Sequence, residues 1–184
     1  LGGKFIIRIE DTDRNRFNPQ AEKHILDSLD WCGIIPDEGP LNGGNYGPYR
    51  QSERKENYRQ RIQELIESGD AYYAFDKTDE LEDQRKESEN KGETFIYNWE
   101  NRKNFKNSFA LSEEETKKLI SKGDYVVRYK TYNEGDENEI SVTDEIRGNI
   151  KVNLKLLDDK IIFKNDGMPT YHFANVVDDY EMKI

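Results

Sequence analysis

Apolar residues in this chain come in short runs separated by charged and glycine-rich stretches, and the first run is the most informative. Residues 5–9 (FIIRI) are rich in β-branched side chains, which predicts a buried strand. The run ends in the carboxylates Glu10, Asp11 and Asp13. In open α/β sheets, ligands bind just beyond the carboxyl ends of the strands. These acids can therefore hold a metal, act in acid/base chemistry or bind a cationic group, or they can simply cap the next helix.

The first helix is predicted over residues 19–31. Asn18 is a good N-cap residue, and Pro19 suits the first helical position because the N–H that it lacks would find no partner there. Gly33 ends the pattern. The apolar residues that helical spacing turns inward are Ala21, Ile25, Leu29 and Cys32.

Residues 37–50 (DEGPLNGGNYGPYR) are too rich in glycine and proline for a helix or strand. A long loop of this kind is more often functional than not. A second helix is predicted over residues 52–68, and a strand over residues 71–75. The second helix turns inward Tyr58, Ile62, Leu65 and Ile66.

The character of the chain changes at Asp76, where a highly charged helix is predicted over residues 79–91. Ser112 and Glu115 form a capping box that opens a short helix, and Gly123 ends it. The strands predicted beyond this helix cover residues 125–130, 140–142, 150–154 and 161–164.

This order of elements predicts an α/β fold with an inserted module. The α/β domain is expected to comprise residues 1–75 and 161–184, with a last helix beginning near Thr170. An α+β module, at about residues 76–160, is expected to interrupt it.

Charge and cysteine content narrow the classes of function. Lys and Arg number 28 against 38 Asp and Glu, and the net charge of −10 disfavours non-specific binding to nucleic acid or anionic membranes, unless the basic residues cluster locally. No apolar run approaches the roughly 20 residues of a membrane-spanning helix. The single cysteine, Cys32, excludes an intrachain disulfide and a cysteine-based zinc cluster, predicts a reducing cytoplasmic location, and is expected to be a small core residue.

Three segments are dense in residue types that chemistry uses: residues 10–16, 47–54 (GPYRQSER) and 169–179 (PTYHFANVVDD). The first could hold Mg²⁺, but no glycine-rich phosphate loop accompanies it, and the second can be read as a turn leading into a helix. In the third, Tyr171 and Asn175 are four residues apart and so share one helix face, which suits a ligand pocket. His24 and His172 are the only histidines, and neither lies in a nucleophile motif, so no covalent protein nucleophile is predicted.

Together these segments resemble a known family. GGKFIIRIEDTDRNR, then DEGP with GG and YGPYRQSER, and finally DGMPTYHFANVVDD occur in this order in bacterial-type glutamyl-tRNA synthetases, class I enzymes with a Rossmann-like catalytic domain. The resemblance covers essentially the whole chain, and IEDTD fits the glutamate enzyme better than its glutaminyl relative. It implies that the module at about residues 76–160 is the acceptor-stem-binding domain.

The resemblance implies a two-step reaction with glutamate, ATP with Mg²⁺, and tRNA(Glu) as partners. Glutamate and ATP form glutamyl-adenylate, and the glutamyl group then moves to the terminal adenosine of the tRNA. Because no protein nucleophile is needed, the protein acts by positioning and charge stabilisation. On this resemblance Glu10 binds the α-ammonium group of glutamate, and Tyr171 and Asn175 line the glutamate pocket.

The resemblance also suggests residues that contact tRNA. Asp13 and Arg16 match positions expected near the terminal adenosine. Three arginines in the module are expected to contact acceptor-stem phosphates or to buttress that surface, with an ordinary surface salt bridge as the alternative for each. They are Arg102, Arg128 and Arg147.

The chain also departs from the family pattern. It has no cysteines for the zinc site that some members carry in the module, and Tyr180 stands where the family usually has histidine. The HIGH-type and KMSKS-type ATP motifs and the anticodon-binding region are missing, so we expect an internal fragment that does not form adenylate alone. Two alternatives remain: a non-catalytic RNA-binding module derived from a synthetase, and a paralogue that transfers glutamate to a modified tRNA base.

Overall fold

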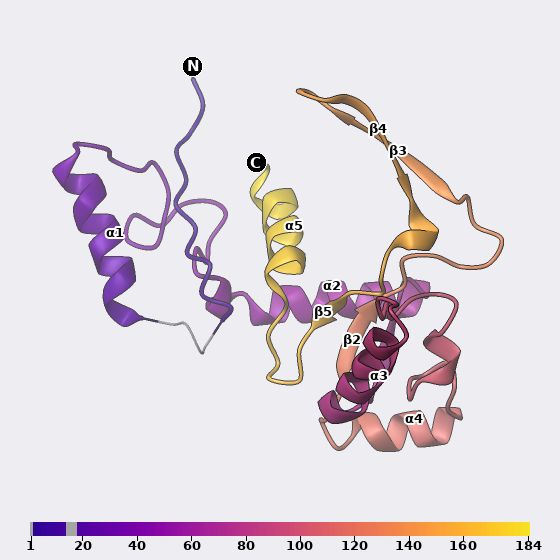
Figure 1. Cartoon of the computed structure of the whole chain (residues 1–184). Helices are drawn as coiled ribbons and strands as arrows, with labels where there is room; N and C mark the ends of the chain where they lie inside the picture. The colour runs from indigo at the N-terminus through magenta and orange to yellow at the C-terminus, as the bar shows by residue number, and fades with distance from the viewer. Residues whose placement is uncertain (1, 14–17) are drawn as a thin grey trace. The chain divides into compact units, whose positions relative to one another are not determined.

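The computed structural model describes residues 2–13 and 18–184, which form two compact units (Figure 1). The first unit comprises Leu1–Arg61 and Gly167–Ile184, and the second comprises Ile62–Asp166. The module predicted at residues 76–160 lies inside the second unit. The limits of this unit are wider than predicted because the strands on either side of the predicted module pair with a strand inside it.

The segment predicted as the first strand forms only isolated parallel bridges in the first unit. Ile6 pairs with Glu38, and Ile9 pairs with Arg50. The prediction of a continuous buried strand was wrong, since Ile7 is buried while Phe5 is 42% exposed. The physical reason is that the backbone partner changes along the segment, from the beginning of the irregular loop to its end, so neither partner runs beside it for long.

Helix α1 spans Pro19–Trp31, as predicted, and the side chain of Asn18 caps it by accepting a hydrogen bond from the N–H of Gln20. The prediction of its inward face was wrong. Ile25 and Cys32 are exposed, as is Ala21, and Leu29 is only half-buried. Helical spacing fixes which residues share a face, but not how much of the protein covers that face.

The glycine-rich loop at residues 37–50 folds around the buried carboxylate of Glu38. This carboxylate accepts hydrogen bonds from Lys4 Nζ at 2.6 Å, from the N–H of Asn45 at 3.0 Å and from the hydroxyl of Tyr49. Gly44 has φ +144°, and a Cβ there would collide with Glu38 and Tyr49. The glycine at this position is therefore required by the packing of the loop.

Hydrogen bonds from Lys4 and Tyr49 lower the pKa of Glu38 below its ordinary value of 4.5. A lowered carboxyl pKa stabilises the fold above the unfolded-state pKa, and this contribution is lost as the pH falls through the folded-state pKa. We therefore expect Glu38→Gln to lower the thermal unfolding midpoint at neutral pH, and the gap to the wild type to close below pH 4.5. Lys4→Met should show the same trend, whereas a gap that does not change with pH would contradict the role given to the charged pair.

The core of the first unit lies where helix α2, Lys55–Ser68, meets helix α5, Tyr171–Met182. A short 3-10 turn, Gln51–Glu53, precedes α2, so the helix begins three residues later than predicted. Tyr58 of α2 packs against Ala174 and Val177 of α5, and all three are buried. This contact lies next to the polar side chains of α5 that form the candidate site.

The second unit contains a three-stranded antiparallel sheet in the order β1-β2-β5. These strands span Ala71–Ala74, Val126–Tyr129 and Ile161–Phe163, close to the predicted ranges. Helix α3, Thr78–Asn90, and helix α4, Glu113–Ile120, belong to the same unit, and the capping box of Ser112 and Glu115 is present. The core beside the sheet is mostly aromatic, with Tyr72, Ala74 and Tyr97 at its centre.

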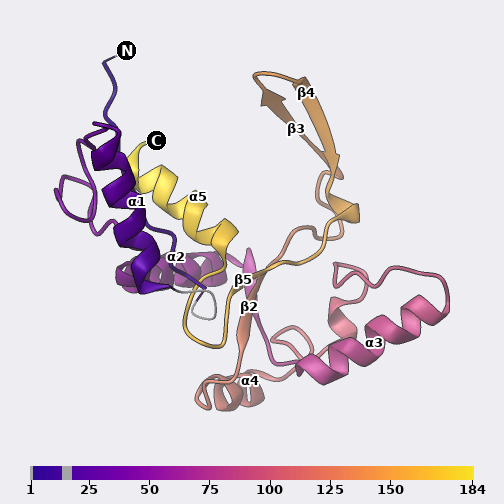
Figure 2. The same cartoon turned by 60° about the vertical axis from the view of Figure 1, so that its left-hand side comes forward.

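Strands β3, Glu139–Asp144, and β4, Gly148–Asn153, pair in a separate antiparallel hairpin. Figure 2 shows this hairpin extending away from the three-stranded sheet of its unit. Every residue of β3 except Asp144 is exposed, and its turn carries Ile146 and Arg147. None of the helices in residues 2–13 and 18–184 has the length and apolar character needed to cross a bilayer.

Candidate functional site: a polar network on helix α5

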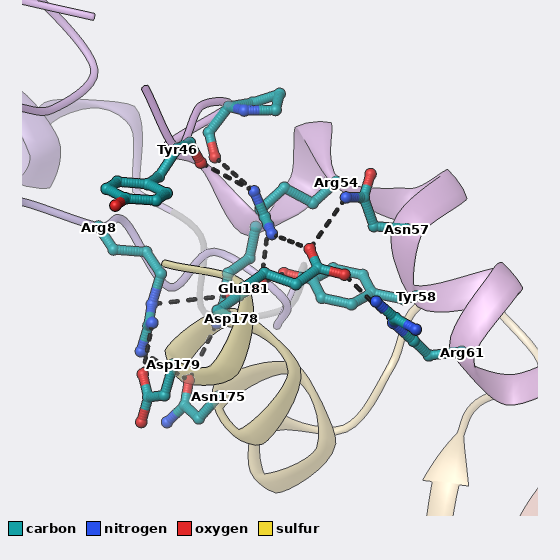
Figure 3. A network of polar contacts seen from close by, with 12 residues as sticks. Arg8, Tyr46, Arg54, Asn57, Tyr58, Arg61, Asn175, Asp178, Asp179 and Glu181 are labelled. Carbon is teal, nitrogen blue, oxygen red and sulfur yellow. Dashed lines mark hydrogen bonds and ion pairs between the residues drawn. The ribbon is translucent and has the colours of Figure 1, made fainter. Parts of the chain in front are cut away.

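The centre of the site is the fully buried carboxylate of Asp178 on α5 (Figure 3). Arg54 Nε donates to it at 2.7 Å, the hydroxyl of Tyr58 at 2.8 Å and the side-chain amide of Gln51 at 2.9 Å. Burial and the neighbouring charge of Asp178 raise the pKa of Tyr58, so its hydroxyl remains a donor at neutral pH. Three donors from the segment at residues 51–58 thus hold one acceptor on α5, which fixes the two segments together.

Arg8 links this network to Glu10, one of the carboxylates that follow the first apolar run. Its guanidinium contacts Asp179 at 2.6 Å, Glu10 at 3.1 Å and the side-chain oxygen of Asn175 at 3.5 Å. Its Nε lies 3.7 Å from Asp178. Because the side chain of Arg8 is only 12% exposed, these contacts hold it in one place, and they join Glu10 to the polar face of α5.

An open hollow of about 520 Å³ lies in the first unit, with Arg8, Glu10, Asp13 and Tyr171 among its lining residues. Asp11 also borders it and accepts hydrogen bonds from the backbone N–H and the hydroxyl of Ser52, at 2.8 Å and 2.6 Å. Asp11 is therefore occupied with fixing the turn before α2. Glu10 and Asp13 are the remaining predicted carboxylates at the hollow.

Two of the three residues predicted for the glutamate pocket lie at one hollow of the first unit. Glu10 and Tyr171 line the same hollow, and Asn175 joins them through Arg8. The side chain of Glu10 is 34% exposed and that of Tyr171 lies largely open, so both are accessible to a ligand. Among the described residues, the Glu10 carboxylate accepts a hydrogen bond from Arg8, and a carboxylate can accept up to four.

Four of the five residues suggested for tRNA contact lie in the described part of the chain. Asp13 is half-buried at the hollow, and Arg16 lies outside the described residues. Arg147 is exposed at the turn of the β3–β4 hairpin, where Asp144 caps the turn by accepting from the N–H of Arg147 at 2.7 Å. Tyr180, the departure from the family pattern, is 78% exposed on α5.

Arg102 and Arg128 are not surface residues, which corrects the prediction that they contact phosphates directly. They are 5% and 7% exposed. Arg102 pairs with the buried carboxylate of Asp159 at 3.0 Å, and Arg128 donates to the backbone carbonyl of the same residue at 2.8 Å. The guanidinium of Arg128 also lies over the ring of Tyr97. Both arginines hold the core of the second unit, so neither is an ordinary surface salt bridge, and the predicted buttressing of the acceptor-stem surface stays a prediction.

Sequence patterns marked the segments that contain Gln51, Arg54 and Asp178, but they assigned no role to these three residues or to Arg8. A signal was present for Arg8, because an arginine within the apolar run FIIRI must find an acceptor when that run is partly buried. Asp178 gave a similar signal, because a charged residue next to the apolar Val176 and Val177 also needs a partner if it is buried. Their partners could not be inferred, since Arg54 and Asp178 are 124 positions apart in the chain.

The described residues contain no group of three or more His, Cys, Asp or Glu side chains placed to hold a metal ion. The polar groups predicted for a ligand are of two kinds. Glu10 offers a carboxylate to a cationic group, while Tyr171 and Asn175 offer neutral hydrogen-bonding groups.

A family model described as "tRNA synthetases class I (E and Q), catalytic domain" matches residues 1–184, the whole chain. The chain belongs to this family. Its mixed α/β structure is accordingly that of the class I catalytic domain, although the comparison does not assign the module within it.

Relatives in this family are about half identical to the chain. A glutamate–tRNA ligase of Christiangramia forsetii is 53% identical over all of this chain and 36% of its own length, and that of Flavobacterium johnsoniae is 50% identical over 98% of this chain and 36% of its own length. The chain thus spans about a third of the length of these class I synthetases.

Solved structures of class I synthetases agree with the computed one. A glutamate tRNA ligase from Elizabethkingia meningosepticum, solved in complex with its amino acid, matches with a TM-score of 0.92 and 49% identity over 100% of this chain and 36% of that one. The glutamate-tRNA synthetase of Elizabethkingia anophelis matches with a TM-score of 0.91 and 49% identity, again over the whole of this chain and 37% of that one.

Proposed function

We propose that the protein carrying this chain is a glutamate–tRNA ligase, and that this chain supplies its glutamate pocket. The observation that carries the proposal is the placement of Glu10 and Tyr171 in one hollow, joined to Asn175 through Arg8. Family membership and relatives named as glutamate–tRNA ligases support the same substrate. Because the chain spans only about a third of those relatives, the complete activity belongs to the full-length protein.

In the proposed reaction, the residues of this chain position glutamate rather than react with it. The Glu10 carboxylate binds the α-ammonium group, while Tyr171 and Asn175 hold the rest of the amino acid by neutral hydrogen bonds. The glutamate carboxylate attacks the α-phosphorus of ATP, releasing pyrophosphate, and a hydroxyl of the terminal ribose of the tRNA then attacks the adenylate and releases AMP. ATP and its Mg²⁺ are substrates of the full-length protein, and no step above requires a nucleophilic side chain.

Because the chain is acidic overall, binding of tRNA must depend on particular basic residues rather than on the charge of the whole chain. At a net charge of −10, an extended attraction to phosphate is unfavourable, so contacts must come from individual exposed basic residues. Arg147 at the hairpin turn is such a residue, and Asp13 lies at the hollow where the tRNA end would meet glutamate. We assign acceptor-stem binding to the β3–β4 hairpin of the second unit.

Arg147→Ala in the full-length protein is expected to weaken tRNA binding, and to lower the slope of log affinity against log salt by about one. The loss follows from removing one phosphate contact, and filter binding over a salt series measures it. Arg85, exposed on α3, provides the matched control, because Arg85→Ala makes the same change of charge. Equal effects of the two substitutions would assign the loss to net charge and contradict a contact at the hairpin.

The proposed function is tested by charging tRNA with radiolabelled amino acids, using the full-length protein. The expected result is ATP-dependent attachment of glutamate to the terminal adenosine, with little attachment of glutamine. Attachment to a modified internal base, which would survive removal of the terminal adenosine, would instead identify the paralogue. Binding of tRNA without any glutamate transfer would identify the non-catalytic RNA-binding module. The encoded sequence on both sides of the chain adds a simple check, because the proposal requires HIGH-type and KMSKS-type motifs there.

A further inference from the structure

Gln51 links the buried carboxylate of Asp178 to Asn175, which the proposed function assigns to the glutamate pocket. Its side chain is fully buried, and its Nε2 donates to Asn175 Oδ1 and to Asp178 Oδ2, each at 2.9 Å. An amide nitrogen carries two hydrogens, so both donors of Gln51 are used. Gln51 therefore links Asn175 and Asp178, and it is the hydrogen-bond donor to both.

The direction of this bridge is set by Asp178. An ionised carboxylate only accepts hydrogen bonds, so the amide of Gln51 must turn its NH₂ group toward Asp178. Arg54 and Tyr58 hold Asp178 from other sides, which prevents it from rotating away. The carbonyl oxygen of Gln51 is buried without a partner among the described residues. This unpartnered oxygen is costly, and it persists because the reverse orientation would place two acceptors against each other.

The orientation of Gln51 then determines that of Asn175. Since Gln51 donates an N–H to Asn175, the side chain of Asn175 must accept this hydrogen bond with its oxygen, Oδ1. Arg8 enforces the same choice, because its guanidinium, a group with donors only, lies 3.5 Å from the same oxygen. The NH₂ group of Asn175 is consequently the end of the amide left for a ligand, and it can bind only an acceptor.

We propose that Gln51 is a positioning residue that fixes Asn175 as a hydrogen-bond donor to a carboxylate oxygen of bound glutamate. This inference rests on the proposed function, since it names the ligand group that Asn175 recognises. In this arrangement a hydrogen-bond acceptor, Glu10, binds the ammonium group of the amino acid. A hydrogen-bond donor, Asn175, binds one of its carboxylates.

Gln51→Met in the full-length protein tests the role of Gln51, because methionine keeps the size of the side chain and removes its donors. We expect the KM for glutamate in tRNA charging to rise by about 10-fold, with kcat changed much less. Tyr72→Phe is the matched control. It removes a buried hydrogen bond to a carboxylate in the second unit, from the Tyr72 hydroxyl to Asp159 at 2.7 Å, so it should lower thermal stability and leave the KM for glutamate unchanged.

A double-mutant cycle separates positioning from general loosening of the site. If Gln51 acts through Asn175, Gln51→Met should add no further increase in KM to a protein that already carries Asn175→Ala. Additive effects, a normal KM in Gln51→Met, or an equal rise in Tyr72→Phe would each overturn the inference. A wild-type protein that fails to charge tRNA with glutamate would instead overturn the proposed function.

Asn175→Asp provides an independent arm if Gln51→Met does not fold. A carboxylate at this position can still accept from Gln51 and Arg8, but it has no hydrogen to donate. We expect the KM for glutamate to rise by at least as much as in Gln51→Met. An unchanged KM would show that the oxygen of Asn175, rather than its NH₂ group, serves the ligand, and would overturn the inference.

Discussion

Glu10→Ala in the full-length protein is expected to lower kcat/KM for glutamate by about 10- to 100-fold in ATP–pyrophosphate exchange with tRNA present. Glu10 supplies the carboxylate that binds the substrate ammonium group, and a hydrogen bond between charged groups of this kind contributes about 1.5–3 kcal/mol. The fold should tolerate the change, because the side chain is 34% exposed and its recorded partner, Arg8, keeps Asp179.

Two further variants identify the cause of that loss. Glu82, exposed on α3, gives a matched control, because Glu82→Ala makes the same change of charge away from the hollow and should retain normal exchange. Glu10→Gln keeps the shape but removes the charge, and it should lose activity nearly as fully as Glu10→Ala. Near-normal exchange by Glu10→Ala would refute the assignment of the ammonium site.

Asp178→Ala is expected to lower the free energy of unfolding by about 3–5 kcal/mol. The substitution leaves the buried guanidinium of Arg54 without its closest buried counter-charge and removes the acceptor for Tyr58 and Gln51. Removing one partner of a buried ion pair is costly because the other charge remains out of water. Denaturant unfolding of the full-length protein, followed by fluorescence, measures the loss.

Asp179 provides the control for the Asp178 prediction, since it is the next residue on α5 and also pairs with an arginine. Its side chain is 49% exposed, so Asp179→Ala should cost about 1 kcal/mol or less. If the two substitutions destabilise the protein equally, the central place given to Asp178 is wrong. Glu181, which also contacts Arg54 at 2.6 Å, is the reason that the loss in Asp178→Ala is not larger.

Local chemistry explains why so many elements could be predicted from the sequence. Asn18 with Pro19 placed the start of α1 correctly, and Ser112 with Glu115 placed the start of α4. Alternating and β-branched residues located β2 and β5 to within about two residues at each end. These signals act between neighbours in the chain, so they do not depend on the rest of the fold.

Predictions failed where burial depends on distant parts of the chain. Cys32 lies at a helical spacing that suits a core, yet it is exposed. Arg102 and Arg128 were expected at a phosphate-binding surface, but Asp159, a residue that no motif singled out, holds both inside the second unit. Burial raises the pKa of Asp159, a sign of how far this carboxyl group lies from water.

In the candidate site, too, features set by neighbouring residues could be predicted, whereas contacts between distant parts of the chain could not. Tyr171 and Asn175 were placed on one helix face by their spacing, and family resemblance added Glu10. The network that orients them, from Arg54 through Asp178 and Gln51, is built across more than 120 positions of sequence and appears only in the folded chain.

A crystal structure of the full-length protein with bound L-glutamate tests the central claim most directly. The account predicts the ammonium nitrogen within hydrogen-bonding distance of the Glu10 carboxylate, with Tyr171 and the NH₂ group of Asn175 against the rest of the ligand. An ordered glutamate that touches none of these three residues would contradict it.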